Sequence, residues 1–225
     1  MARDTYSIVS HLIKDFALFL DEFLRDPPFS RPEQLENHLQ TIRLRRQLGT
    51  ASDAIASDEF LASLYSTLQA WGIGKRGSDL VHIEQFADAI RMKETEIALL
   101  EGISFDERTT KVADLADQLW NIISNLGIVT NNATVVSGTK ALHHIHPDLV
   151  VPVDRAYTQK FFGWQNQDFQ YGQAKCFRTS FTSFVRIARA VELAKYRDDG
   201  WCSSNTKIID NAIVGFVTHK KQHGV

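Results

Sequence analysis

Residues 7–24, SIVSHLIKDFALFLDEFL, decide the fold class because their apolar side chains recur every three or four positions. The recurring residues are Ile8, Leu12, Phe16, Phe19, Leu20 and Phe23. This spacing puts them on one face of an α-helix, and similar spacing recurs along almost the whole chain, whereas strict β-type alternation is scarce. We therefore predict an all-α protein, in which the first helix ends before Pro27 and Pro28.

The composition is that of a folded globular protein. Of its 225 residues, 44% are apolar and 23% are charged, which predicts a single compact multi-helix domain over residues 1–225; two helical lobes are the alternative. Two cysteines are too few for a disulfide framework, and charges interrupt the apolar N-terminal pattern. We expect a soluble, cytoplasmic protein that does not bind membranes.

Proline, glycine and capping residues divide the rest of the chain into further helices. We expect a helix over residues 31–48 after a Ser30 cap, and a capped helix from about Asp58. A glycine-rich break over residues 72–77 precedes a helix that opens at Ser78. Further helices are expected over residues 79–92, 94–102, 110–126 and 177–197, with a last one capped by Ser204 or Asn205.

The stretch Gly72-Ile73-Gly74 has two interpretations. It resembles the tight turn of a helix-hairpin-helix, whose backbone amides can bind a DNA phosphate. A helix C-cap followed by a loop is the simpler explanation, and the one that we favour.

Residues 135–161, VSGTKALHHIHPDLVVPVDRAYTQKFF, combine the reactive residue types. Lys140 is expected at the start of a short helix, residues 141–146, which Pro147 ends. The following residues should run extended to Pro152, so that Asp154 caps the next helix. That capping role is a purely structural explanation of Asp154.

The elements Gly138-Thr139-Lys140 and Pro152-Val153-Asp154 resemble the helix-hairpin-helix DNA glycosylase superfamily, and within it the 8-oxoguanine glycosylase and lyase branch. The resemblance covers about 20 residues. It implies a similar all-α fold, DNA as the partner, Lys140 as a nucleophile and Asp154 as the essential carboxylate. Val136 stands where the family turn has its first glycine, Ser137 replaces a hydrophobic residue, and the separation of 14 residues between Lys140 and Asp154 is shorter than in the family.

The resemblance also suggests how DNA binds. Backbone-phosphate contacts are expected from Ser137, Gly138, Thr139, Arg155 and Lys160, with Arg178, Arg186 and Arg189 as further candidates. A flipped base would be held by His144, Tyr157, Phe161 and Trp164. Core packing explains the aromatic residues as well, and a solvated surface explains the cations. A net charge of −2 gives no attraction of the whole chain to DNA, so any binding depends on a local patch.

The three histidines at 143, 144 and 146 raise the question of a metal. Only His143 and His146 are expected on one helix face, and no HExxH motif or cysteine partner is near. We therefore predict no metal and no cofactor. The sequence favours a DNA glycosylase-like base-excision protein with AP-lyase activity; the alternative is a non-catalytic all-α binding or protein-interaction module.

Overall fold

The protein is all-α, as predicted. The computed structural model describes residues 4–29, 31–74, 79–104 and 111–223. In these ranges the chain forms helices without strands, apart from one isolated antiparallel bridge between Leu80 and Val129. Among the helices described there, none combines the length and the apolar run that would cross a membrane.

The N-terminal stretch forms two helices, α1 (Thr5–Lys14) and α2 (Phe16–Arg25). The prediction of one continuous helix is wrong, because the chain leaves helical geometry at Asp15, where φ is −112° and ψ is 31°. Aspartate is a weak helix former, and the carboxylate of Asp15 lies 3.5 Å from the His11 ring.

Helix α2 packs closely along the C-terminal helix α13 (Asn205–His223). The two backbones meet at Gly215, where an added Cβ would lie 1.8 Å from the carbonyl oxygen of Phe19. Only glycine fits this crossing.

The first half of the chain continues through short and medium helices. They are α3 (Pro32–Leu48), α4 (Ala51–Ala56), α5 (Asp58–Ala70), α6 (Ile83–Arg91), α7 (Glu94–Ala98) and α8 (Val112–Ser124). The predicted helices over 31–48 and from Asp58 are confirmed, and the Ser57 hydroxyl caps α5 by accepting the N–H of Phe60 at 3.2 Å. The predicted Ser30 cap lies outside the described residues, and so does Ser78. The helix predicted over residues 79–92 begins later than expected, because residues 79–82 are not helical and α6 starts at Ile83.

Glycine-rich residues 72–74 end α5. Gly72 has a φ of 84°, and the N–H groups of Gly72 and Ile73 donate to the carbonyls of Gln69 and Leu68, both at 3.0 Å. The helix C-cap interpretation is thus confirmed, and these two amides are already used within the chain.

The second half contains α9 (Thr134–Ile145), α10 (Thr158–Phe162), α11 (Asn166–Tyr171), α12 (Gln173–Ala190), the 3₁₀ helix η1 (Leu193–Tyr196) and α13. The long helix expected over 177–197 begins earlier than predicted and ends at Ala190. Ser204 caps α13 as expected, accepting the N–H of Lys207 at 3.2 Å.

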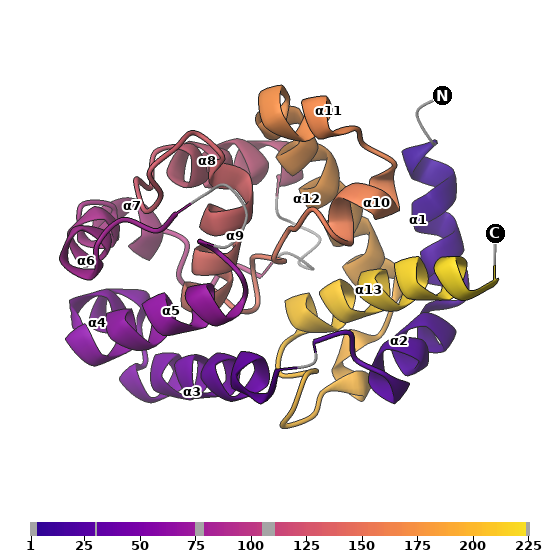
Figure 1. The fold of residues 1–225 in the computed structure, drawn as a ribbon, viewed down its shortest axis with the longest axis horizontal. Coiled ribbons are helices and arrows are strands. Elements are labelled where there is room, and N and C mark those ends of the chain that lie inside the picture. Colours follow the sequence, from indigo (N-terminus) through magenta and orange to yellow (C-terminus); the bar gives the residue numbers. More distant parts are fainter. Residues whose placement is uncertain (1–3, 30, 75–78, 105–110, 224–225) are drawn as a thin grey trace.

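Figure 1 shows how these helices are arranged. Helices α3 to α8 gather on one side, while α1, α2, α10 and α13 lie on the other, where both termini are found. Helix α9 contacts α3, α5 and α8, which lie on the first side, and it also contacts α12. Residues distant in sequence therefore meet around α9.

Candidate functional site

A cavity of about 360 Å³ opens where these helices meet. Its wall includes Gln34 of α3, Trp71 at the end of α5, Lys140 of α9, part of residues 152–157, and Trp201, Lys207 and Asp210 from the C-terminal part. A volume of this order is at the lower end of the range for small-molecule pockets, so it suits a small ligand rather than an extended one.

Lys140 lies inside a helix, not at its start. Helix α9 begins at Thr134, so the expected turn over residues 136–140 does not exist, and Gly138 and Thr139 are buried within the helix. The early start has a physical cause: the side chains of Asn131 and Gln173 accept the N–H groups of Ala133 and Val135 at 2.9 Å and 3.0 Å. These bonds satisfy amides at the first turn, where no intrahelical partner exists.

The Lys140 side chain is buried and faces the cavity. Its Nζ donates to the carbonyl oxygen of Trp71 at 3.0 Å. Burial lowers the pKa of the Lys140 ammonium below its usual value, while the carboxylates of Asp154 and Asp210 act in the opposite direction. A lowered pKa increases the fraction of neutral amine, which is the nucleophilic form.

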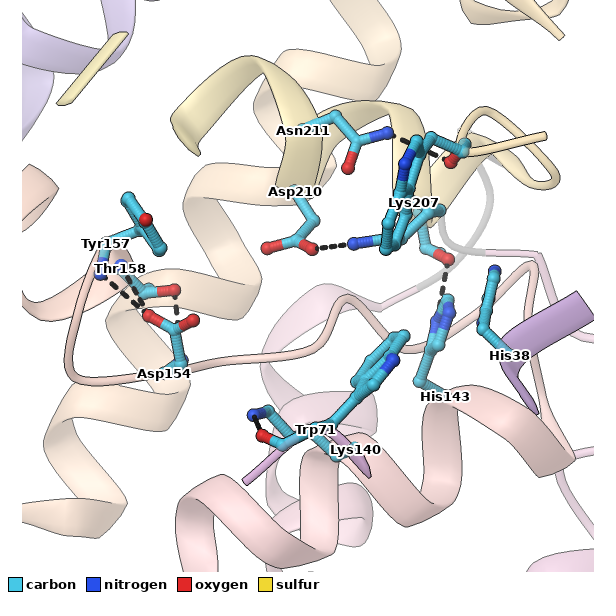
Figure 2. A network of polar contacts seen from close by, with 12 residues as sticks. His38, Trp71, Lys140, His143, Asp154, Tyr157, Thr158, Lys207, Asp210 and Asn211 are labelled. Atoms are coloured by element: carbon cyan, nitrogen blue, oxygen red, sulfur yellow. Dashed lines mark hydrogen bonds and ion pairs between the residues drawn. The ribbon is translucent and has the colours of Figure 1, made fainter. Parts of the chain in front are cut away.

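Asp154 caps the turn that precedes α10, not the helix itself: the predicted N-cap position is wrong, because α10 begins at Thr158 with Tyr157 as its N-cap. Its Oδ1 accepts the N–H groups of Tyr157 at 2.7 Å and Thr158 at 3.4 Å, and its own N–H donates to the Thr158 hydroxyl at 3.1 Å. The residue also lines the cavity. Figure 2 shows the carboxylate held by this turn, across the site from the buried Lys207.

Lys207 and Asp210 are site residues that the sequence patterns did not single out. Both side chains are buried, and Lys207 Nζ lies 2.5 Å from Asp210 Oδ2 (Figure 2). The ammonium also lies over three aromatic rings, with Nζ-to-centroid distances of 5.4 Å to Phe29, 5.0 Å to Trp71 and 5.2 Å to Trp201. Burial raises the pKa of the Asp210 carboxyl, and Lys207 opposes that shift.

The charged side chains of the cavity wall are cationic on balance. Four are basic and two are acidic: Arg31, Lys140, Arg155, Lys207, Asp154 and Asp210. The chain as a whole carries a net charge of −2. The local surplus is of the sign that attracts a phosphate group.

The residues expected to hold a base separate into two groups. Tyr157 lines the cavity, whereas His144, Phe161 and Trp164 are not part of its wall. Phe161 is fully buried against Phe216, at a ring distance of 5.1 Å, and Trp164 stacks on Phe162 at 4.5 Å. Core packing holds these two rings. The remaining aromatic wall comes instead from Phe29, Trp71, Phe169 and Trp201.

The residues expected to contact DNA phosphates are also divided. Ser137 and Arg155 line the cavity, and Arg155 and Lys160 are exposed. Gly138 packs against α8, where an added Cβ would lie 2.9 Å from Ile123 Cγ2. Two of the further candidates have partners within the protein: Arg178 pairs with Asp117, and Arg186 lies over the Tyr6 ring at 3.7 Å.

The histidines are arranged differently from the expected pair of His143 and His146. His143 and His144 both contact His38 of α3, at ring distances of 5.7 Å and 5.1 Å. His146 instead bonds through Nε2 to the carbonyl oxygen of Ile97 at 2.9 Å. His38, the partner that the sequence patterns did not reveal, lies 105 residues before His143, and no local motif around it indicates this contact.

Comparison of the chain with models of protein families, with curated proteins and with solved structures finds no match to any of them.

Proposed function

We propose that the protein is a DNA glycosylase-like base-excision protein with AP-lyase activity, in which Lys140 is the nucleophile and Asp154 is the assisting carboxylate. The observation that carries the proposal is that these two side chains, 14 positions apart, line the same cavity. Their residue types match the chemistry: an amine attacks the sugar, and a carboxylate stabilises positive charge that develops on it.

The aromatic lining of the cavity is suited to stacking on a planar base. The rings of Trp71, Tyr157 and Trp201 contribute to its lining, and flipped bases are held by stacking on such side chains. The cationic surplus among the charged wall residues suits the phosphates on either side of a flipped nucleotide.

The proposed reaction uses the neutral amine of Lys140. Its nitrogen attacks the sugar C1′, the electron pair of the glycosidic bond leaves with the base, and the base takes up a proton. The attacking nitrogen gives up one proton, and the ring oxygen O4′ takes up a proton as the C1′–O4′ bond breaks, which gives a protonated Schiff base. Loss of a proton from C2′ then expels the 3′-phosphate and cleaves the strand. Burial of Lys140 favours the first step because it lowers the cost of deprotonation.

Borohydride trapping tests this proposal. Wild-type protein is mixed with duplexes that carry damaged bases or abasic sites, and borohydride reduces any Schiff base to a stable secondary amine. We expect a covalent adduct that Lys140→Met removes and that Lys175→Met, at an exposed lysine outside the cavity wall, retains. Absence of an adduct and of base release across the substrate panel would overturn the proposal.

Lys207→Met identifies which amine reacts. Lys207 is the second buried lysine of the cavity wall. Loss of the adduct in Lys207→Met, with retention in Lys140→Met, would move the nucleophile to Lys207. Each variant is compared with wild type by circular dichroism, so that misfolding is separated from lost chemistry.

The alternative function is a non-catalytic all-α binding module. Helix α9 supports it, because residues 136–140 form no hairpin turn that could bind a phosphate through free amides. Salt dependence separates the two: phosphate-dominated DNA binding weakens steeply as salt is added. No retention on DNA at low salt would favour the binding module.

A further inference from the structure

Three histidines converge behind the cavity wall. His38 of α3 and the neighbours His143 and His144 of α9 are each fully buried. One ring nitrogen from each lies within 4.8 Å of the others. Figure 2 shows His38 and His143 side by side, on the side of Trp71 away from Asp154.

The outer ring nitrogens of this cluster have partners. His144 Nδ1 donates to the Lys140 carbonyl at 2.8 Å, and His143 Nδ1 donates to the Val150 carbonyl at 2.9 Å. His38 Nε2 lies 2.9 Å from the Ser203 hydroxyl. Metal-binding histidines typically hold their second nitrogen in this way, which orients the ring and fixes the tautomer.

The other three ring nitrogens, His38 Nδ1, His143 Nε2 and His144 Nε2, lie close together at the centre of the cluster. Because carbonyl oxygens only accept, the protons of His143 and His144 reside on Nδ1, and each Nε2 carries a lone pair. His144 Nε2 lies 3.0 Å from His38 Nδ1. His143 Nε2 is buried without a hydrogen-bond partner among the described residues. A buried nitrogen without a hydrogen-bond partner lowers the stability of the folded protein by about 1–3 kcal/mol. A metal ion bound to this nitrogen would remove that cost.

We propose that His38, His143 and His144 bind one divalent transition-metal ion, with zinc as the first candidate. Imidazole ligands suit zinc, copper and nickel, whereas magnesium and calcium prefer oxygen ligands. Zn–N bonds of about 2.0–2.1 Å in a tetrahedral site put the ligand nitrogens about 3.3 Å apart. The 3.0 Å separation of His38 Nδ1 and His144 Nε2 is close to that value, and an inward movement of His143, whose ligand nitrogen lies within 4.8 Å of the other two, completes three ligands.

The surroundings are compatible with a bound cation. Burial lowers the pKa of all three histidines, so their rings are neutral and their lone pairs are available at neutral pH. Without a metal, His38 Nδ1–H donates to the lone pair of His144 Nε2; metal binding moves the His38 proton to Nε2, where the Ser203 hydroxyl accepts it. The ammonium group of Lys207, whose charge acts on all three histidines, is paired with Asp210, which offsets its repulsion of the ion.

Trp71 links the proposed metal site to the cavity. Its ring lies 5.2 Å from His38, 6.1 Å from His143 and 4.9 Å from His144, and the same residue lines the cavity. The proposal does not depend on glycosylase activity, but the ion would lie directly behind the wall that holds the guest.

Metal analysis of the full chain tests the proposal. The protein is stripped with a chelator, incubated with a small excess of zinc, desalted and analysed by elemental mass spectrometry. We expect about one zinc per chain and a raised melting temperature, and with cobalt a visible absorption band typical of low coordination number. Folded wild-type protein that retains less than about a tenth of an equivalent would overturn the proposal.

Variants locate the ion. His143→Gln should abolish stoichiometric binding, and Ser203→Ala should weaken it by about tenfold because an outer-shell partner is lost. The matched control is His146→Gln, which changes a buried histidine on the same segment that is not in the cluster. His82→Ala removes an exposed histidine that pairs with Glu84. If His143→Gln is folded and binds like wild type, or if His82→Ala abolishes binding, the three-histidine site is wrong.

Discussion

The hydroxyl group of Thr139 accepts a hydrogen bond from the backbone N–H of Val153 at 3.1 Å, and it donates its own proton to the carbonyl oxygen of Val135 at 2.7 Å. Thr139 and Val153 are both buried, and they directly precede Lys140 and Asp154. One side chain therefore ties α9 to the extended segment and sets the position of the two candidate catalytic residues relative to each other.

Replacing Thr139 by valine tests this link. Valine has nearly the same shape but leaves the Val153 N–H unpaired in the interior, so we expect the free energy of unfolding to fall by about 1–3 kcal/mol. Thr139→Ser keeps the hydroxyl and should retain most of the bond. Urea unfolding followed by circular dichroism measures both variants, and equal losses in the two would show that the hydrogen bond is not the cause.

Part of the site could be predicted from the sequence because it is local. Pro152 keeps the preceding residue out of helical geometry, so Asp154 follows an extended segment and caps the next turn. Tyr157 lies three residues beyond Asp154 and reaches the cavity through that same turn. Helical periodicity likewise predicted the all-α fold.

The rest of the site depends on contacts between distant segments. The start of α9 depends partly on Gln173. Its side-chain oxygen accepts the N–H of Val135, which lies 38 residues earlier in the sequence. His38, Trp71 and Lys207 come from three different helices or helix ends, and each has a sequence context typical of an ordinary helix. Side-chain contacts of this kind leave no spacing pattern in the sequence, so only the structure brings them together.

Breaking the buried pair of Lys207 and Asp210 should be costly. Lys207→Met leaves an uncompensated carboxylate in the interior, and a loss of about 3–5 kcal/mol in unfolding free energy is expected. Lys207→Met combined with Asp210→Leu removes both charges and should cost less than Lys207→Met alone. Chemical denaturation of the single and double variants gives the coupling energy; additive losses would mean that the two side chains do not stabilise each other.

The histidine cluster predicts that the metal-free protein loses stability in mild acid. Burial lowers the pKa of His144 to about 4, from 6.5 in an unperturbed histidine. Between these values the unfolded chain binds a proton that the folded chain does not, so unfolding becomes easier as the pH falls. His144 alone should contribute a loss of about 2 kcal/mol between about pH 7.5 and about pH 5.

His38 and His143 act with the same sign, because burial lowers the pKa of each. Urea unfolding in the presence of a chelator, repeated across this pH range, measures the combined effect. His144→Gln should reduce the pH dependence without removing it, because His38 and His143 remain, while exposed His82→Ala should leave it unchanged. Stability that rises toward acid would contradict the neutral state assigned to the cluster.

The close crossing of α2 and α13 predicts that Gly215 cannot be replaced. Gly215→Ala would force a methyl group into the backbone of α2 at Phe19, and separation of the helices should cost about 3 kcal/mol or more by analogy with severe overpacking. Gly200→Ala is the control, since its added Cβ meets nothing closer than 3.5 Å. Thermal unfolding compares the two, and similar melting temperatures would show that the helices adjust easily.

The two roles of Asp154 can be separated by two substitutions. Asp154→Asn keeps an oxygen that accepts the N–H of Tyr157, so the cap and the stability should be nearly preserved. It removes the negative charge, and base release should fall by about 10²–10³ if that charge stabilises the developing cation. Asp154→Ala removes the cap as well, so it should lose both the activity and about 1 kcal/mol of stability. Stability is measured by denaturation and base release by chromatography; wild-type release by a folded Asp154→Asn variant would reduce Asp154 to a turn cap.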